Sequence, residues 1–473
     1  MRTLFPREVN WGVFFILIII LRALFPDISM FSYVALVISI HQLTLLITFI
    51  GYIVPVRYLF GAFMCLQFFI GPTLAYNGLD QYQYHVYRMQ VPEAQYFSYA
   101  LPAVSCFLLG LHISAGNFKG EIINQEGVLR FVKRNPLIPY IFIGVGFVAS
   151  VVSGFFSSEV AFVFYVLGSF KFIGLFMLVF AEKRLKTVPL ILVIGSIVAS
   201  SLGDGMFHDL LTWILFIGSV YAIKYKFGTN LKLISCISFI LLAITIQQLK
   251  TGYRAARTNG QDISEGLETL ADTYDAETQN GQSIYSFASL APGLVRINQG
   301  FIITNIMRMV PAKVPYSNGE EMGQVLEAAI LPRIIAPNKL QAGDRVVFEK
   351  YSGMHLRIGT SMGLSSPGDA YVNFGVSGGC VFMFFLGLCY SLVLNYFDKR
   401  SKNQPVLILF LPLIFYYPIR PDCELQTILG HLVKSTFIIL AIVYLWKEVF
   451  IEEDPRKIAA MKEASSSADP ILT

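Results

Sequence analysis

Long uninterrupted runs of apolar residues restrict the fold of this chain more than any other feature of its sequence. Two of them read WGVFFILIIILRALF (11–25) and LIPYIFIGVGFVASVVSGFF (137–156). Such runs approach or exceed the roughly 18–20 residues with which a helix crosses about 30 Å of hydrocarbon. Only 14% of the 473 residues are charged, against about 25% in soluble domains. We therefore predict an all-α polytopic membrane protein, because only helices and closed barrels satisfy their backbone hydrogen bonds within lipid.

About twelve transmembrane helices are predicted. The first run follows Arg2 and Arg7 without a small-residue cleavage site behind it, so we expect it to remain as a signal anchor. The predicted spans cover residues 10–25, 31–53, 56–75, 94–114, 137–156, 159–181, 188–203, 207–223, 230–248, 373–397, 404–418 and 428–447.

Basic residues alternate along the connections between these spans. Every second connection carries them, whereas the short connections between carry only Arg88 and Arg420. Because Lys and Arg are enriched in cytoplasmic loops, both termini are predicted to be cytoplasmic, which requires an even number of spans. The net charge of +5 comes mostly from these loops, so it implies no nucleic-acid partner. The residues assigned to the cytoplasm are Arg57, Lys119, Arg130, Lys133, Arg134, Lys183, Arg184, Lys186, Lys224, Lys226, Lys399, Arg400, Lys402, Lys447, Arg456, Lys457 and Lys462.

One long segment interrupts the series of spans. Residues 249–372 are predicted to form a large external loop, periplasmic or extracellular, between spans 9 and 10. A structureless loop of that length is uncommon, so we expect short amphipathic helices packed against the bundle. Residues 1–248 hold spans 1–9, residues 373–448 hold spans 10–12, and residues 449–473 are predicted to be a disordered cytoplasmic tail.

Basic residues follow the ninth predicted span. If its helix continues past the bilayer, Lys250, Arg254 and Arg257 lie at i, i+4 and i+7 on one face. They could anchor in lipid phosphates. Alternatively they could bind a lipid-linked phosphate or diphosphate, because a guanidinium bonds two phosphate oxygens at once.

Residues 331–371 would supply the other half of such a site. Two prolines exclude a continuous helix there and leave Arg333 and Lys339 on a shaped loop. The segment ends in GTSMGLSSPGDAY, a turn-rich stretch in which Asp369 stands just before Tyr371.

Three motifs resemble those of the oligosaccharide repeat-unit polymerases, the O-antigen polymerase (Wzy-type) family. They are PRIIAPNK (332–339), TSMGLSSPGDAYVNFGVSGG (360–379) and GYRAAR (252–257). The spacing of Arg357 and Gly368 also fits an Arg-x10-Gly pattern of that family. The chain departs from the family at SLGDGMFHD, where members commonly carry Gly-Ser-Arg. Because Asp204, His208 and Asp209 stand there, no phosphate-binding role is carried over to that position.

The resemblance implies a reaction on the external face of a bacterial inner membrane. A growing glycan and a single repeat unit are each held on a polyprenyl diphosphate. A sugar hydroxyl of one attacks the anomeric carbon of the other, and polyprenyl diphosphate leaves. The implied partners are these lipid-linked oligosaccharides, membrane lipids and a chain-length regulator protein. No cofactor or metal is expected, because arginines could neutralise the diphosphate and the sequence has no Asp-x-Asp or His cluster.

Such a reaction needs cations at the leaving diphosphate and a base for the hydroxyl proton. The predicted base is Asp369, with His355 and Glu349 behind it; the alternative for Asp369 is a turn or helix cap. The tyrosines could stack on sugar rings or belong to an interfacial aromatic belt. The predicted substrate- and diphosphate-binding residues are Lys250, Tyr253, Arg254, Arg257, Arg333, Lys339, Arg357, Tyr371 and Arg420.

Other interpretations remain open at this point. An O-antigen ligase runs similar chemistry and also has a large external loop, and a transporter or flippase of lipid-linked oligosaccharide is the further alternative. A metal-dependent lipid-sugar glycosyltransferase fits poorly, since Asp27 is the lone acid of the first external loop. Lys171, in the middle of a span, could line a substrate path or pair with Glu159, Asp204 or Asp209.

Overall fold

All regular secondary structure in the described part of the chain is helical. The computed structural model describes residues 3–78, 87–114, 121–156, 158–181, 187–204, 207–258, 287–331, 336, 340, 345–356 and 362–450. The C-terminal tail was predicted to be disordered. From residue 451 onward it lies outside the described ranges.

The first half of the chain begins with α1 and ends with the long α12. Its π-helical turn η1 continues α3 into α4 without a break. The elements are α1 (Trp11–Leu24), α2 (Met30–Phe49), α3 (Val56–Cys65), η1 (Leu66–Ile70), α4 (Gly71–Tyr76), α5 (Glu93–Ile113), α6 (Gln125–Arg134), α7 (Ile138–Val152), η4 (Ser153–Phe155), α8 (Ser158–Gly168), α9 (Phe170–Phe180), α10 (Thr187–Asp204), α11 (His208–Tyr225) and α12 (Thr229–Thr258).

The second half contains four short helices and then the longest one, α18. The elements are α14 (Phe287–Ile297), α15 (Gly300–Met309), α16 (Glu320–Ile330), α17 (Arg345–Ser352), α18 (Ser366–Ser401), η6 (Pro405–Phe410), α19 (Leu411–Ile414), α20 (Leu425–Leu445) and α21 (Lys447–Phe450).

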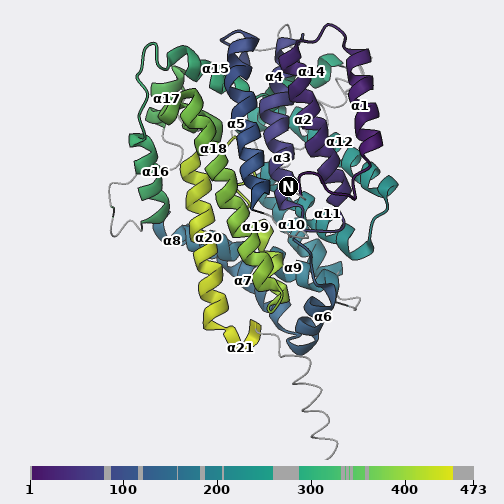
Figure 1. The fold of residues 1–473 in the computed structure, drawn as a ribbon. Helices are drawn as coiled ribbons and strands as arrows, with labels where there is room; N and C mark the ends of the chain where they lie inside the picture. Colours follow the sequence, from purple (N-terminus) through teal and green to yellow (C-terminus); the bar gives the residue numbers. More distant parts are fainter. Residues whose placement is uncertain are drawn as a thin grey trace, which may run out of the picture.

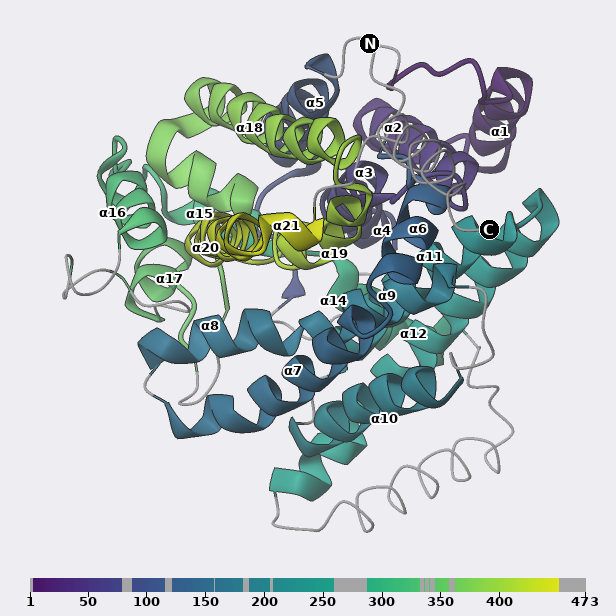
Figure 2. The same ribbon diagram turned by 90° about the horizontal axis from the view of Figure 1, so that it is seen from below.

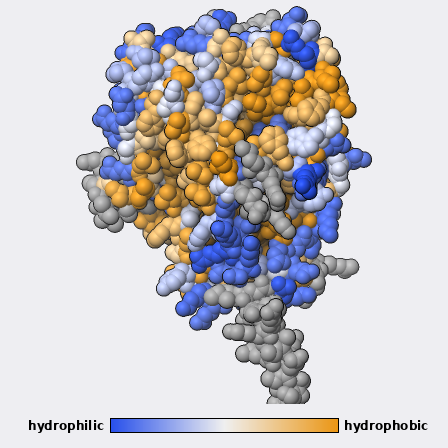
Figure 3. All heavy atoms as spheres, viewed as in Figure 1, coloured by the Kyte–Doolittle hydropathy of each residue, from blue (hydrophilic) through white to orange (hydrophobic). Residues whose placement is uncertain are grey.

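Eight helices among the described residues are long and apolar enough to cross a membrane. Every one of the twelve predicted spans coincides with helix, but α1, α10 and the η6–α19 pair are shorter, and α11 is not among the eight. A membrane protein with several apolar helices is therefore supported, whereas the count of about twelve stays a prediction. Figure 3 shows the corresponding surface: apolar residues cover a wide zone of this face, and hydrophilic residues gather along its upper edge and toward its lower end.

Helices α5 and α18 pack closely because both carry glycine at the contact. A Cβ atom on Gly110 would lie 2.0 Å from the backbone oxygen of Phe384, and one on Gly387 would lie 2.1 Å from that of Phe107. Seen along the bundle, α19 and α20 occupy the middle, with α2, α5 and α18 on one side and α7, α8 and α10 on the other (Figure 2).

Polar contacts join connections that the charge pattern assigns to the same side of the membrane. On the predicted cytoplasmic side, the fully buried Arg57 and Glu121 form an ion pair of 3.0 Å between the connections after spans 2 and 4. On the predicted external side, Asp209 near the start of the predicted span 207–223 and Tyr416 near the end of the predicted span 404–418 share a hydrogen bond of 2.5 Å. These contacts agree with the relative sides that were predicted; the orientation in the membrane remains part of the proposal below.

Four short helices, α14 to α17, lie within the predicted external loop of residues 249–372, of which the structure describes 249–258, 287–331, 336, 340, 345–356 and 362–372. Helices α14, α15 and α17 lie at the end of the bundle remote from α6 and α21 (Figure 1). α16 and α17 bury one face each, whereas α15 is buried from Gly300 to Met307. Of these four helices, α15 thus belongs to the folded core.

Candidate functional site

The motif SSPGDAYVNFG, residues 365–375, contains the N-cap and the beginning of α18. Ser365 adopts φ 72° and caps the helix, its Oγ accepting from the backbone N–H of Gly368 at 3.3 Å. Pro367 stands in the first turn, where its missing N–H costs nothing. The hydroxyl of Tyr99 in α5 donates to the carbonyl oxygen of Pro367 at 2.5 Å. The turn that carries Asp369 is therefore held in a fixed position.

Asp369 connects this turn to the start of α20. Its Oδ2 accepts a hydrogen bond of 2.8 Å from the backbone N–H of Leu425. The N–H groups of a first helical turn lack partners within their own helix and are satisfied by caps. Asp369 thus acts as a cap supplied by another helix, the role that the sequence left open beside that of a base.

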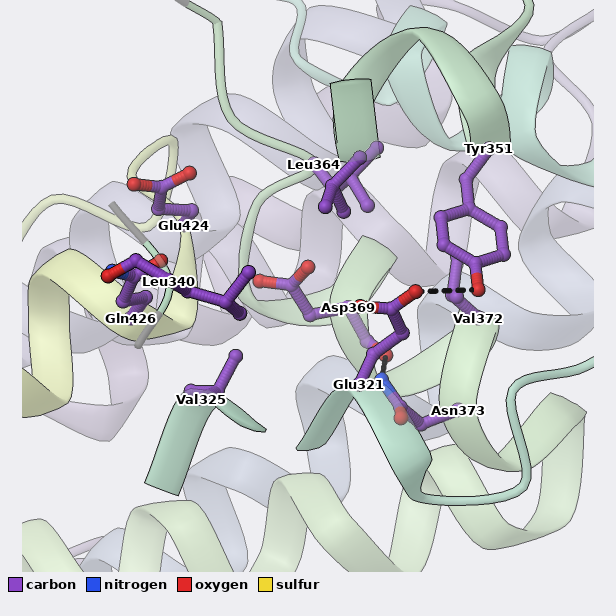
Figure 4. Close-up of a pocket in the computed structure, with 11 residues that line it drawn as sticks. Glu321, Val325, Leu340, Tyr351, Leu364, Asp369, Val372, Asn373, Glu424 and Gln426 are labelled. Carbon is purple, nitrogen blue, oxygen red and sulfur yellow. Dashed lines mark hydrogen bonds between the residues drawn. The ribbon is translucent and has the colours of Figure 1, made fainter. Parts of the chain in front are cut away.

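Asp369 also lines a small cavity together with two other acids, Glu321 and Glu424 (Figure 4). The volume of the cavity is about 30 Å³. One water molecule needs roughly 10–15 Å³ by this kind of measure. The cavity therefore has room for water but not for a sugar ring in this conformation.

The neighbours of Asp369 have partners of their own. Glu321 accepts from Lys350 Nζ at 3.1 Å and from the hydroxyl of Tyr351 at 3.0 Å. Asn373 donates to the backbone oxygen of Asp369 at 2.9 Å and accepts from the backbone N–H of Met322 at 3.0 Å. Helices α16, α17, α18 and α20 meet through these bonds.

The other two predicted bases lie apart from this cavity. The backbone N–H of Leu356 donates to Glu349 at 2.8 Å and the Arg345 Nε at 2.6 Å, and together they lower the pKa of Glu349 to about 2. A carboxylate so stabilised is a weak base. His355 is 92% exposed, with its Nδ1 at 3.5 Å from the Glu349 carboxylate.

Tyr371, predicted to stack on a sugar, is packed inside the protein. Its side chain is 6% exposed, and its ring meets the ring of Tyr99 edge to face at 5.0 Å. In this structure its ring stabilises the junction of α5 and α18 rather than facing the cavity.

The predicted cationic residues are placed only in part. The helical backbone of α12 continues through Thr258, so Lys250, Tyr253, Arg254 and Arg257 belong to one helix, as expected for a span that runs on past the bilayer. The side chains of these four residues lie outside the described part of the structure. So do Arg333, Lys339 and Arg357 as a whole.

Arg420, in contrast, is fully described. It lies in residues 415–424, the connection between α19 and α20, and its side chain is 19% exposed. Its closest carboxylate is Asp422, with Nη2 and Oδ2 3.6 Å apart, and its guanidinium carbon lies 5.7 Å from the centre of the Tyr417 ring. No described residue accepts a hydrogen bond from the guanidinium within ordinary distance. Within the described part of the chain, this largely enclosed guanidinium therefore has donors that could bind a ligand.

A second group of polar residues surrounds Arg420. Asp209, the second residue of α11, accepts from Tyr416 and lies 2.6 Å from the Nε2 of His208. Asp422 accepts from the Nε2 of Gln67 at 3.2 Å. Gln67 belongs to the π-helical turn η1, a distortion that is frequent at functional sites.

Sequence reasoning missed most of this Arg420 cluster, which consists of Gln67, His208, Asp209, Tyr416, Arg420 and Asp422. His208 and Asp209 were considered only as a departure from a family motif. Arg420 was predicted to bind substrate, but its neighbours were not predicted. The available signal was the coincidence of charged residues in two external connections, after spans 7 and 11.

Lys171 does not pair with Asp209. Its Nζ lies 3.4 Å from Ser150 Oγ. The same Nζ lies 5.5 Å from the ring centre of Phe147 and 5.6 Å from that of Phe172.

Among the described residues no group of three or more His, Cys, Asp or Glu side chains could hold a metal ion. No family model, no curated protein and no solved structure matches this chain.

Proposed function

We propose that the protein is a membrane polymerase that joins polyprenyl-diphosphate-linked oligosaccharide repeat units into a surface polysaccharide. The reaction is glycosyl transfer on the external face of a bacterial inner membrane, with both protein termini in the cytoplasm. The bond between an anomeric carbon and a diphosphate oxygen breaks, and a bond between that carbon and a hydroxyl oxygen of a second repeat unit forms.

The observation that carries this proposal is Arg420 with its unused donors. Negative charge develops on the diphosphate as it leaves, and preorganised cationic donors in an enclosed site stabilise that charge more strongly than donors in water. A guanidinium is suited to this role because it stays charged and bonds two phosphate oxygens in parallel. Arg420 lies in a connection predicted to face the outside, where lipid-linked repeat units would be found.

The long helix α12 supports the same reaction. Its three basic positions at i, i+4 and i+7 follow an apolar run and so are expected at the height of the lipid headgroups. In this proposal they bind the diphosphates of the two lipid carriers together with Arg333, Lys339 and Arg357. Arg420 acts at the bond that breaks.

The pattern of surface glycan tests the proposal. A host strain without this protein is compared with the same strain carrying the gene again, and the glycan is separated on a gel. A core capped by a single repeat unit, with the ladder of longer chains lost, is expected. Bare core with polymer left on its lipid carrier would instead identify a ligase, and bare core with lone lipid-linked repeats trapped inside would identify a flippase.

A further inference from the structure

The side chains of His208 and Asp209 form a hydrogen-bonded pair outside the cavity that holds Asp369. His208 Nε2 and Asp209 Oδ1 are 2.6 Å apart, and the same Oδ1 accepts from the Tyr416 hydroxyl at 2.5 Å. With its Nε2 bound to a carboxylate, the imidazole carries its proton there and leaves Nδ1 as an acceptor. The side chain of His208 is 36% exposed, so this nitrogen is open to a substrate.

Arg420 follows Tyr416 by four residues in the same connection, and it interacts electrostatically with both Asp209 and Tyr416. A base and an anion-binding guanidinium are therefore held together by the contact between α11 and residues 415–424. Tyr416 in turn stacks on Trp213 with ring centres 5.3 Å apart, which fixes its position.

We infer that His208, positioned by Asp209 and Tyr416, accepts the proton of the acceptor sugar hydroxyl, and this inference rests on the function proposed above. The hydroxyl proton moves to Nδ1 of His208 as the hydroxyl oxygen forms its bond to the anomeric carbon. The electron pair of the broken carbon–oxygen bond leaves with polyprenyl diphosphate, whose charge Arg420 stabilises. The imidazolium then returns its proton to water. No other reactant is needed.

Asp369, the base predicted from the sequence, fits this role less well. One of its oxygens is bound to the N–H of Leu425, and its cavity of about 30 Å³ also holds Glu321 and Glu424. Two further carboxylates and the lack of space both work against a sugar hydroxyl there. The side chains of His208 and Asp209 are instead 36% and 43% exposed.

The test uses membranes of the host strain that lacks the protein, since these hold the natural lipid-linked repeat units. Purified full-length protein is added, and polymer length and released polyprenyl diphosphate are measured against substrate concentration. His208→Gln should lower the rate by about 100-fold or more, the contribution typical of a general base. Asp369→Asn and His355→Gln, tested in parallel, should lower it less. A His208→Gln protein within twofold of the wild type would overturn the inference, as would a larger loss in either parallel variant.

Asp209→Asn separates positioning from a merely structural role. The amide keeps the size of the side chain but no longer orients the imidazole as a carboxylate does, so kcat should fall while KM stays near the wild-type value. A rise in KM with kcat unchanged would contradict the assignment. Protein level and thermal unfolding in detergent show whether each variant folds. If the wild-type protein itself forms no polymer, the proposed function fails; if it does and His208→Gln is as active, only this inference fails.

Discussion

Two polar regions near the predicted external end of the bundle differ in how completely their hydrogen bonds are satisfied. The first, the Asp369 corner, comprises Ser365, Asp369 and Asn373, and each of these side chains bonds a backbone group. The second is the Arg420 cluster. Among the described residues, the guanidinium of Arg420 has a carboxylate at 3.6 Å and the Tyr417 ring but no hydrogen-bond acceptor, and the amide oxygen of Gln67 is buried without a partner.

The two regions are connected through the backbone. The N–H of Ser366 donates to the carbonyl oxygen of Pro421 at 3.3 Å, so the first turn of α18 holds the connection that carries Arg420. An enclosed polar group without a partner costs about 1–3 kcal/mol. We interpret the Asp369 corner, whose side chains are hydrogen-bonded to the backbone, as a scaffold. The Arg420 cluster beside it, which keeps polar groups without partners among the described residues, is then the binding site. The motif that carries the family resemblance builds the scaffold.

The largest effect is expected at Arg420, and it tests whether the unused donors serve the reaction. Arg420→Ala should lower polymer formation by about 10²–10³-fold, the loss seen when one donor to a developing charge is removed. Arg420→Lys should show an intermediate loss, because an ammonium keeps the charge without the planar fork. The measurement is polymer length and released polyprenyl diphosphate at equal amounts of protein in the membrane.

Arg88→Ala is the matched control, since Arg88 is the other arginine in a short connection predicted to be external, and it is exposed. Its loss should leave polymer formation near the wild-type rate. Equal losses for both arginines would show that general surface charge is responsible, and the difference between the two regions would then have no functional meaning.

The next effect is expected at Asp369 and concerns stability more than chemistry. Asp369→Asn keeps an oxygen that can accept from the N–H of Leu425, so the reaction should lose much less than the roughly 10²–10⁴-fold typical of a missing base. Asp369→Ala leaves that N–H without its acceptor and should destabilise the protein by about 1–3 kcal/mol. Thermal unfolding in detergent and polymer formation are measured on both variants.

A different result at Asp369 would reverse the comparison. If Asp369→Asn folds like the wild type but loses activity as a missing base would, the cavity beside Asp369 contains the reaction and the Arg420 cluster is the support. The pair of variants decides between these outcomes, because only the alanine removes the cap.

Much of the architecture could be predicted from the sequence. Hydrophobic runs located all twelve helical segments, because a spanning helix is defined by local composition. The distribution of Lys and Arg predicted which connections share a side of the membrane, and that assignment stays a prediction. Whether four of these segments span the membrane depends on more than composition, since they are short or less apolar.

The site was harder to predict, because its contacts join distant parts of the chain. Asp369 could be a cap or a base until its bond to Leu425, 56 residues later, is known. Asp209 and Tyr416 are 207 residues apart. The burial of Tyr371 follows from Tyr99 on another helix, and no pattern around either tyrosine reveals it.

The smallest effect on the reaction is expected from Gly375, where α18 bends between the Asp369 corner and the rest of the helix. Gly375 has φ 66° and ψ −158°, a region that side chains avoid, and a Cβ there would lie 3.3 Å from the Tyr316 ring. Gly375→Ala should therefore destabilise the protein by about 1–3 kcal/mol.

Gly323→Ala is the control for that change. Gly323 lies inside α16, with no atom of the described structure within 4 Å of an added Cβ, so alanine should stabilise the helix by roughly 0.5–1 kcal/mol. Thermal unfolding should thus shift in opposite directions for the two variants, while the folded fraction of each polymerises at a rate close to that of the wild type. If Gly375→Ala instead unfolds normally but loses activity as Arg420→Ala does, the bend serves the chemistry itself, and the Asp369 corner cannot be treated as support alone.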